Sequence, residues 1–285
     1  MAEIIRGRAV AKAYRAKIKV EAEALTAAGV IPGLAVIIVG DNPASQIYVK
    51  HKKLDCEECS IHSEIIALPE SSSEADVLDE IRTLNKRSDI HGILVQMPLP
   101  KHINPDKMIG EILPEKDVDA FNPVNVGKIM IGDFDFLPCT PAGVMALLDE
   151  YNIPIEGMEC VVIGRSNIVG KPQAMLLLHR NATVTICHSK TKNLAEVCRR
   201  ADILIAAAGR RNLVTADMVK DGVTVIDVAM NTKEDGKLCG DIDFDEVSKK
   251  AAYITPVPGG VGPMTRVMLL KNTLTAARNL SAGKF

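Results

Sequence analysis

The stretch Glu159-Cys-Val-Val-Ile-Gly164-Arg-Ser-Asn-Ile-Val-Gly170 decides the fold. Its first five residues are mostly apolar and β-branched, and a polar turn follows between Gly164 and Gly170. A strand that runs through such a turn into a helix directs backbone N–H groups and the helix dipole at an anion. The sequence of this turn departs from the standard G-x-G-x-x-G motif, because Ser166 occupies the position of the second glycine. The stretch therefore fits either a dinucleotide-binding turn or an ordinary strand-to-helix turn.

More strands and helices follow in alternation after this stretch. Apolar runs predict strands at Thr183–Cys187, Ile203–Ala207 and Thr224–Val228. Thr140-Pro141 predicts the start of a helix that ends near Tyr151, and Asn193 with Glu196 predicts a capping box at the start of another. Strands that alternate with helices predict a parallel sheet, so this half is expected to be Rossmann-like.

The first half of the chain shows the same alternation. Strands are expected at Leu34–Val39, Ile61–Leu68 and Gly92–Gln96, with helices that start at Asn42-Pro43, ending near Glu58, and at Ser73. The fold class is therefore α/β, with two parallel-sheet domains and a cleft between them.

The domain boundaries are expected in polar, glycine-rich and proline-rich sequence. We expect residues 1–119 to form the first domain, joined by a C-terminal helix at 266–285, and residues 120–265 to form the Rossmann-like domain. Asp119–Pro138 is the expected hinge, and an amphipathic helix from Met264 to about Leu280 is expected to return to the first domain.

Composition excludes several classes of partner. The 34 Lys and Arg residues against 36 Asp and Glu leave a net charge of −2, and aromatic residues make up 3% of the 285, so nucleic acid is not an expected partner. The longest apolar runs, Leu34–Val39 and Ile203–Ala208, are far too short to span a membrane. The N-terminal sequence lacks the pattern of a signal peptide, which predicts a cytoplasmic protein.

The chain contains 7 cysteines, an odd number that favours reduced thiols over a disulfide framework. Cys56 and Cys59 form one C-x-x-C pair, which supplies half of a zinc site or a redox pair, or else two packing thiols. Because no second pair or suitably spaced histidine accompanies them, no metal is expected.

The choice of cofactor is predicted from the end of the second strand of the Rossmann-like half. His188-Ser189-Lys190-Thr191 stands there, where an NAD-dependent fold usually has an acidic residue. Hydroxyl donors and the guanidinium of Arg165 suit a 2′-phosphate, which a carboxylate would repel. NADP is therefore favoured over NAD, unless the tetrapeptide is an ordinary polar loop.

Three polar residues of the first half are expected to share a pocket. Tyr48 and Lys52 are one helical turn apart, and Gln96 ends a strand on the side where parallel sheets bind ligands, so Gln96 is expected to reach Lys52. The alternative is a half-exposed helix face beside an ordinary strand end.

The segment Tyr253–Thr265 holds three prolines and three glycines among thirteen residues. It predicts a rigid loop with exposed backbone, either for a flat ligand or for a crossover between domains.

Six motifs together resemble the bifunctional methylenetetrahydrofolate dehydrogenase/methenyltetrahydrofolate cyclohydrolase family. They run in order over some 220 residues: Ser45-Gln-Ile-Tyr48-Val49 with Lys52, Gln96-Met-Pro-Leu-Pro100, Pro114-Glu-Lys-Asp-Val-Asp119, Pro138-Cys-Thr-Pro141, Gly164–Gly170 and Pro256–Thr265. The chain departs from the family pattern at Ala120, Asn122 and Ala229-Met230, where Gly, His and Gly-Ile are usual.

The resemblance implies a role for each matching residue. Lys52 would be the catalytic lysine, Gln96 would tune it, Tyr48 would stack on or position the folate, and Asp119, or else Asp117, would hold the pterin. The folate would also contact Pro258, Gly259 and Gly260. NADP would be held by Arg165, Ser166 and Ser189, in a turn that Gly164, Ile168 and Gly170 shape. The family resemblance also implies a homodimer.

The implied reaction has two steps with different needs. Loss of a hydride from 5,10-methylenetetrahydrofolate leaves a stabilised cation and requires orientation, whereas hydration to 10-formyltetrahydrofolate requires a base, for which Lys52 is the candidate.

Two other functions are alternatives to this one. One is a different NADP-dependent dehydrogenase, for example for a quinate-like acid, and the other is a non-catalytic NADP sensor.

Overall fold

The computed structural model describes residues 2–283, except for the side chain of Ala44, so Met1 and residues 284–285 of the expected first domain lie outside the described residues. The described residues form two compact units. Unit 1 falls within Met1–Lys12 and Thr140–Thr265, and unit 2 falls within Ala13–Cys139 and Arg266–Phe285. Each unit contains a parallel sheet flanked by helices, which confirms the predicted fold class. The cleft expected between the domains stays a prediction.

The boundaries of these units differ from those of the expected domains. The N-terminal residues belong with unit 1, because strand β1 (Glu3–Ile4) pairs with β11 (Tyr253–Ile254) at one edge of its sheet. The expected hinge at 119–138 belongs with unit 2 and contains helix α5 (Pro123–Ile131). The side chain of Asn272 holds the end of this segment, by a 2.8 Å hydrogen bond to the carbonyl of Leu137.

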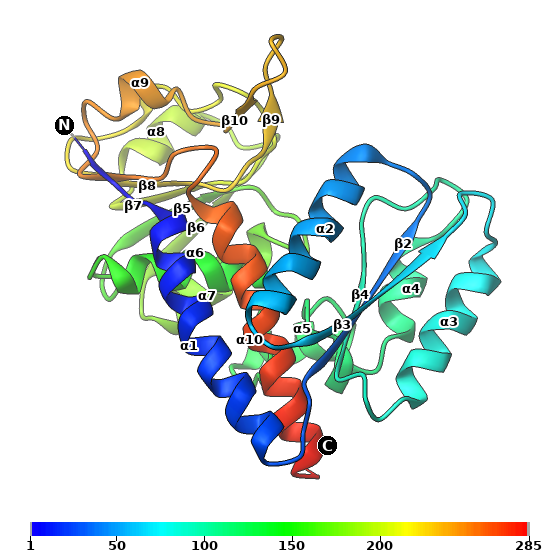
Figure 1. Cartoon of the computed structure of the whole chain (residues 1–285). Helices are drawn as coiled ribbons and strands as arrows, with labels where there is room; N and C mark the ends of the chain where they lie inside the picture. The colour runs from blue at the N-terminus through cyan, green and yellow to red at the C-terminus, as the bar shows by residue number, and fades with distance from the viewer. Residues whose placement is uncertain (1, 284–285) are drawn as a thin grey trace. The chain divides into compact units, whose positions relative to one another are not determined.

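Unit 2 contains a three-stranded parallel sheet with the order β3-β2-β4. The strands are β2 (Gly33–Val39), β3 (His62–Leu68) and β4 (Gly92–Val95). Every residue of β2 and β4 is buried, as expected for parallel strands covered on both faces. The helices that follow β2 and β3 lie on either side of this sheet (Figure 1): α2 (Pro43–Glu58) and α3 (Glu74–Lys86).

The helices of unit 2 begin where the sequence predicts. The side chain of Asn42 accepts the Ser45 N–H at the start of α2, and Ser73 and Asp76 form the predicted capping box of α3. The unit also contains α4 (Pro105–Glu111), the short 3-10 helix η1 (Pro114–Lys116), most of α1 (Gly7–Ala27) and most of α10 (Val261–Ser281). An ion pair between Arg278 and Glu21 joins the last two helices.

Unit 1 contains a six-stranded parallel sheet with the order β1-β11-β8-β7-β5-β6. Its four longest strands are β5 (Glu159–Ile163), β6 (Thr183–Cys187), β7 (Ile203–Ala206) and β8 (Thr224–Asp227), of which β6 lies at one edge. The connecting helices are α6 (Cys139–Glu150), α7 (Gly170–His179), α8 (Leu194–Arg199), η2 (Ala216–Met218) and α9 (Phe244–Val247). An antiparallel hairpin of β9 (Asn231–Thr232) and β10 (Leu238–Cys239) projects from the unit (Figure 1).

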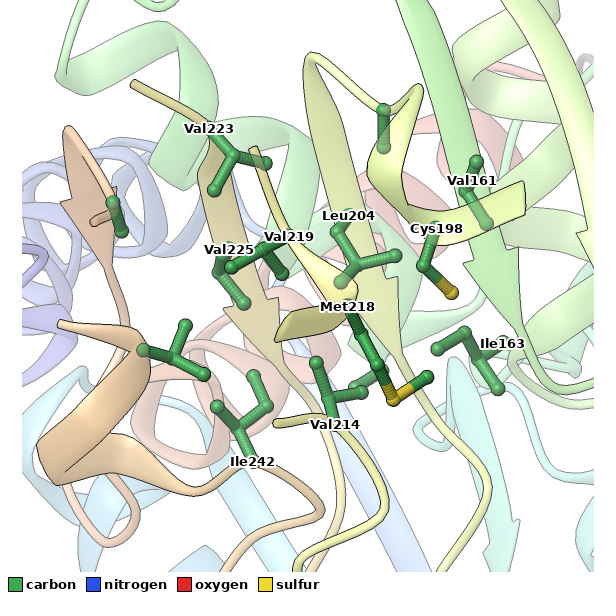
Figure 2. Packing of buried hydrophobic residues seen from close by; sticks show 14 of the residues in the cluster. Val161, Ile163, Cys198, Leu204, Val214, Met218, Val219, Val223, Val225 and Ile242 are labelled. Carbon is green, nitrogen blue, oxygen red and sulfur yellow. The ribbon is translucent and has the colours of Figure 1, made fainter. Parts of the chain in front are cut away.

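The core of unit 1 includes one face of this sheet. Figure 2 shows Val161, Leu204 and Val225, from three neighbouring strands, packed with Met218 and Ile242. Among the described residues, no helix combines the length and hydropathy needed to cross a bilayer.

The helices predicted at Asn193 and Thr140-Pro141 begin within one residue of the expected positions, but the predicted caps do not form. Asn193 has a left-handed backbone, with φ 52°, and its side chain makes no capping hydrogen bond, so no capping box forms at α8. Thr140 lies inside α6, which starts one residue earlier, and its hydroxyl lies 3.0 Å from that of Thr265.

Candidate active site and dinucleotide turn

Lys52 and Gln96 form a hydrogen-bonded pair in unit 2. The backbone N–H of Gln96 donates to the carbonyl of Ile37 at 2.8 Å, which anchors this residue at the end of the sheet. The Nζ atom of Lys52 then donates to Oε1 of Gln96 at 2.9 Å, and Nε2 of Gln96 donates to the carbonyl of Met97 at 2.7 Å. The contact predicted between these two residues is confirmed.

Asp119 lies beside this pair. Its carboxylate interacts electrostatically with Lys52, and it lies near the thiol of Cys139, which donates to the carbonyl of Val118 at 3.5 Å. Burial raises the pKa of Asp119, and the nearby Lys52 partly offsets this effect. The pKa of Cys139 is raised well above its usual range by burial and by Asp119, so this thiol stays protonated and serves as a donor.

Lys52 is less basic than an exposed lysine. Burial lowers its pKa, the charge of Asp119 raises it, and the positive charge of Arg266 lowers it further. The net effect is a lowered pKa, which increases the fraction of neutral amine near neutral pH. A neutral amine on a half-buried helix face can accept a proton, as a general base must.

Asp117 has a different environment from Asp119. It is 2% exposed, and one of its oxygens accepts the backbone N–H of Asn122 at 2.8 Å and Nδ2 of Asn125 at 2.9 Å. Burial raises the pKa of Asp117 to about 6. Because these bonds tie it to the start of α5, the geometry favours Asp119 over Asp117 as the acid beside Lys52.

The departures at Ala120 and Asn122 are accommodated locally. Ala120 has a φ of 56°, a left-handed conformation that glycine adopts with less strain and that explains the glycine usual in the family pattern. Asn122 caps α5, because its Oδ1 accepts the N–H of Val124, and its Nδ2 donates to the carbonyl of Ile112 at 2.9 Å.

Sequence reasoning missed two charged residues next to the lysine. Asp55 follows Lys52 by three residues on α2, and Nε of Arg266 lies 3.3 Å from its Oδ2. Arg266 also opposes the rise that burial causes in the pKa of Tyr48. The i, i+3 spacing of Lys52 and Asp55 was a usable signal, but nothing in the sequence placed Arg266 beside them.

The turn after β5 in unit 1 is built by close backbone contacts. A Cβ on Gly164 would lie 2.3 Å from the carbonyl oxygen of Ala207, and a Cβ on Gly170 would lie 2.2 Å from that of Gly164. Gly170 thus allows α7 to begin directly against the turn, which is the role of the last glycine in a dinucleotide fingerprint. Despite its unusual sequence, the turn therefore has the close backbone packing of a dinucleotide fingerprint.

The polar residues expected around the dinucleotide lie at two adjacent strand ends. Ile163 of β5 pairs with Cys187 of β6, so Arg165 and Ser189 each come two residues after a paired position. Both are exposed, as are Ser166 and Ile168. The hydroxyl of Ser166 accepts the N–H of Gly170 at 3.3 Å, which helps to shape the turn. Exposed cationic and hydroxyl groups at this edge suit a phosphorylated nucleotide.

The loop with Pro258, Gly259 and Gly260 belongs to unit 1, whereas Tyr48, Lys52, Gln96 and Asp119 belong to unit 2. The N–H of Arg8 donates to the carbonyl of Gly259 at 3.2 Å, so the start of α1 supports this loop.

The C-x-x-C pair lacks the features of a metal or redox site. Cys56 and Cys59 are both buried, and burial raises their pKa values to about 12 and about 11. Within residues 2–283, no group of three or more His, Cys, Asp or Glu side chains has a geometry suited to a metal ion.

Comparisons with known proteins agree over the whole chain. Residues 5–119 match the model of the tetrahydrofolate dehydrogenase/cyclohydrolase catalytic domain, and residues 138–281 match that of the NAD(P)-binding domain of the same family. The bifunctional protein FolD of Ruminiclostridium cellulolyticum is 57% identical over 96% of this chain and 97% of its own.

Solved structures give the same result. The bifunctional FolD of Campylobacter jejuni is 51% identical, with a TM-score of 0.96 over 98% of this chain and 100% of its own. The FolD of Trypanosoma brucei, solved with NADP and an inhibitor, is 41% identical, with a TM-score of 0.94 over 98% of each chain.

Proposed function

Because the chain belongs to the tetrahydrofolate dehydrogenase/cyclohydrolase family, we propose that it oxidises 5,10-methylenetetrahydrofolate with NADP and then hydrolyses the product. The first reaction gives 5,10-methenyltetrahydrofolate, and the second gives 10-formyltetrahydrofolate. The observation that carries this proposal is the bond between Lys52 and Gln96 beside Asp119, which holds a lysine of lowered pKa in place as a base.

Lys52 acts in the hydrolysis. Water that adds to the methenyl carbon must lose a proton, and the neutral amine of Lys52 accepts it directly or through a second water. A cationic substrate next to Lys52 lowers its pKa further, which increases the fraction of neutral amine that can accept the proton. Gln96 holds the amine in one orientation, because its Oε1 accepts a hydrogen bond from Nζ of Lys52. This oxygen carries no charge, so it does not favour the ammonium form as a carboxylate would.

The other residues of unit 2 position the folate. Asp119 binds the N–H groups of the pterin ring, for which a carboxylate is a suitable acceptor, and Tyr48 packs against the substrate from the same helix face as Lys52. Pro258, Gly259 and Gly260 of unit 1 contact the folate through exposed backbone. The family resemblance of these motifs supports these assignments, as does the placement of Asp119 and of residues 258–260 outside helices and strands.

Arg165, Ser166 and Ser189 hold NADP. The turn fits a dinucleotide, since its two glycines allow close backbone packing. Arg165 and Ser189 follow the paired ends of β5 and β6, so a 2′-phosphate can lie between the guanidinium and the hydroxyl. Ile168 and Gly170 shape the turn, together with Gly164. When held there, NADP would supply the acceptor for the hydride of the methylene carbon, and the protein would contribute by orienting both partners.

We also propose that the protein is a cytoplasmic homodimer. The family resemblance supports this proposal. Light scattering across micromolar dilutions tests it, because a mass near the 30.7 kDa of one chain would exclude the dimer.

The direct test is a coupled assay. The purified protein is mixed with NADP and 5,10-methylenetetrahydrofolate while the absorbances of NADPH and of the methenyl compound are recorded. We expect NADPH to form and the methenyl signal to stay low, because the second step consumes it. Binding of NADP without consumption of the folate would indicate a sensor and exclude the enzyme.

A further inference from the structure

Two buried carboxylates in unit 1 are unused by the proposed chemistry. Asp227 is the last residue of β8, and Asp241 follows the β9–β10 hairpin. They are 4% and 0% exposed. Burial of a carboxylate is unfavourable unless it accepts several hydrogen bonds, so the groups that donate to these two carboxylates are expected to have a structural role.

Asp241 is bound by the loop that follows β7. Its Oδ2 accepts the backbone N–H groups of Ala208 at 2.7 Å and Gly209 at 3.0 Å, and its Oδ1 accepts that of Arg210 at 2.6 Å. The side chain of Asn231 gives a fourth bond, at 3.0 Å. One carboxylate thus fixes three consecutive peptide groups of this loop.

Asp227 in turn fixes Asp241. Its carboxylate accepts the backbone N–H groups of Asp241 at 3.1 Å and of Ile242 at 3.0 Å. The approach is so close that a Cβ on Gly240 would lie 1.8 Å from Oδ2 of Asp227. The end of β8 therefore holds Asp241, and Asp241 holds the loop after β7.

The topology places this loop beside the dinucleotide turn. The chain passes from β5 to the outer strand β6 and then crosses to β7, on the other side of β5. Ligands of such sheets bind at this reversal, beyond the carboxyl ends of the strands. The adenosine half lies over β5 and β6, where Arg165 and Ser189 stand, so the nicotinamide half extends over β7 and β8.

We propose that Asp241 is a positioning residue that sets the loop 208–210 for the nicotinamide half of NADP. This inference rests on the proposed function, because it requires NADP as the ligand. Asp241 acts through the peptide groups that it binds and does not touch the reacting atoms. Its loss should therefore affect one half of the dinucleotide and spare the other.

The test compares two ligands on the full-length protein. Asp241→Asn keeps the shape of the side chain but replaces one acceptor oxygen with an amide donor, which faces backbone N–H groups. By calorimetric titration we expect its Kd for NADP to rise at least about tenfold, from the cost of unsatisfied buried donors, while its Kd for adenosine 2′,5′-bisphosphate changes less than about twofold. Asp245→Asn, on the exposed start of α9, is the matched control and should change neither.

A milder variant keeps the test decisive if Asp241→Asn folds poorly. Asn231→Ala removes one of the four donors, and we expect a rise of about threefold in the Kd for NADP, with the bisphosphate again unaffected. An equal loss of both ligands, or an unchanged Kd for NADP, would overturn the inference. Failure of the unmodified protein to bind NADP at all would instead overturn the proposed function.

Discussion

The Nζ atom of Lys52 donates to Oε1 of Gln96 at 2.9 Å, and Oε1 is an acceptor that carries no charge. A carboxylate in the same place would stabilise the ammonium form of the lysine and oppose a role as base. An amide oxygen orients the amine with a weaker effect on its pKa. The identity of residue 96 is therefore as relevant to the chemistry as that of Lys52.

Replacement of Lys52 should separate the two activities. Lys52→Met keeps an apolar stem but deletes the amine, so we expect cyclohydrolase turnover to fall by about 10² or more, the usual contribution of a general base, with measurable dehydrogenase activity left. The methenyl compound should then accumulate, as its absorbance would show. Lys53→Met, at the exposed neighbouring position, is the control. If both activities fell by one factor at unchanged folate affinity, Lys52 would orient the substrate and the base would lie elsewhere.

The charge of Asp119 should be visible in the pH dependence of hydrolysis. In the proposed hydrolysis Lys52 acts as a neutral amine, so turnover should rise as the pH rises through its pKa, and Asp119 raises that pKa. Asp119→Asn removes the negative charge and should move the midpoint of the kcat profile to lower pH at saturating folate. The exposed Asp106→Asn serves as the comparison. A midpoint that stays in place or moves to higher pH would show that the titrating group is not Lys52.

Arg165 should decide between the two nicotinamide cofactors. Arg165→Ala removes a guanidinium but leaves the glycine turn, so NADP binding should weaken by about tenfold or more, the worth of a charge-assisted hydrogen bond, while NAD binding changes little. Titration with each cofactor measures this. Equal weakening of both would mean that Arg165 supports the turn, and a native preference for NAD would remove the argument for a 2′-phosphate.

Much of the fold was predictable because its signals are local. The strand β2 differs by one residue from the predicted run, since an unbroken apolar sequence ending at Gly40 has few other interpretations. Asn42 and Ser73 mark helix starts by side-chain bonds to residues three positions away. Asn193 carries the same type of sequence signal, but the local backbone takes a left-handed conformation, so residue type alone did not determine the cap.

Long-range contacts were harder to predict. The pairing of β1 with β11 joins residues about 250 positions apart through strands of two residues, too short for any periodic pattern. The long helix α1 was not predicted either, although its Ala, Lys and Glu content favours a helix. In the site, helical spacing brought Tyr48 and Lys52 together. Arg266 and Cys139 approach Lys52 only through tertiary packing, and Asp241 acts through backbone N–H groups that a sequence pattern does not reveal.

Asn272 should be important for the stability of unit 2. It is 7% exposed on α10, and its Nδ2 donates to the carbonyls of Val118 and Leu137, both at 2.8 Å. Asn272→Ala leaves these acceptors without the amide and should lower the free energy of unfolding by about 1–3 kcal/mol. Urea denaturation measures the loss, with Lys271→Ala, at an exposed position of the same helix, as control. A change as small as that of the control would mean that water replaces the amide without cost.

Two glycine-to-alanine variants, both in helices, should change the free energy of unfolding in opposite directions, because only one of the two sites has space for the added methyl group. Gly127 lies inside α5 with nothing within 4 Å of an added Cβ, so Gly127→Ala should raise the free energy of unfolding by about 0.5–1 kcal/mol. Gly170 begins α7, where the same methyl group would lie 2.2 Å from the Gly164 carbonyl oxygen and 2.7 Å from the Arg165 nitrogen. Both of these are backbone atoms, which cannot move aside as a flexible side chain does.

Gly170→Ala should therefore lower the free energy of unfolding by about 2 kcal/mol or more and weaken NADP binding, because α7 must move away from the turn that holds the phosphates. Calorimetry gives the first quantity, and titration with NADP gives the second. Folate binding, which in the proposed function depends mainly on residues of unit 2, is the internal reference. If Gly170→Ala were as stable as Gly127→Ala and bound NADP normally, the close packing of α7 against the turn would not be needed, and the phosphates would have to be held by side chains such as Arg165 alone.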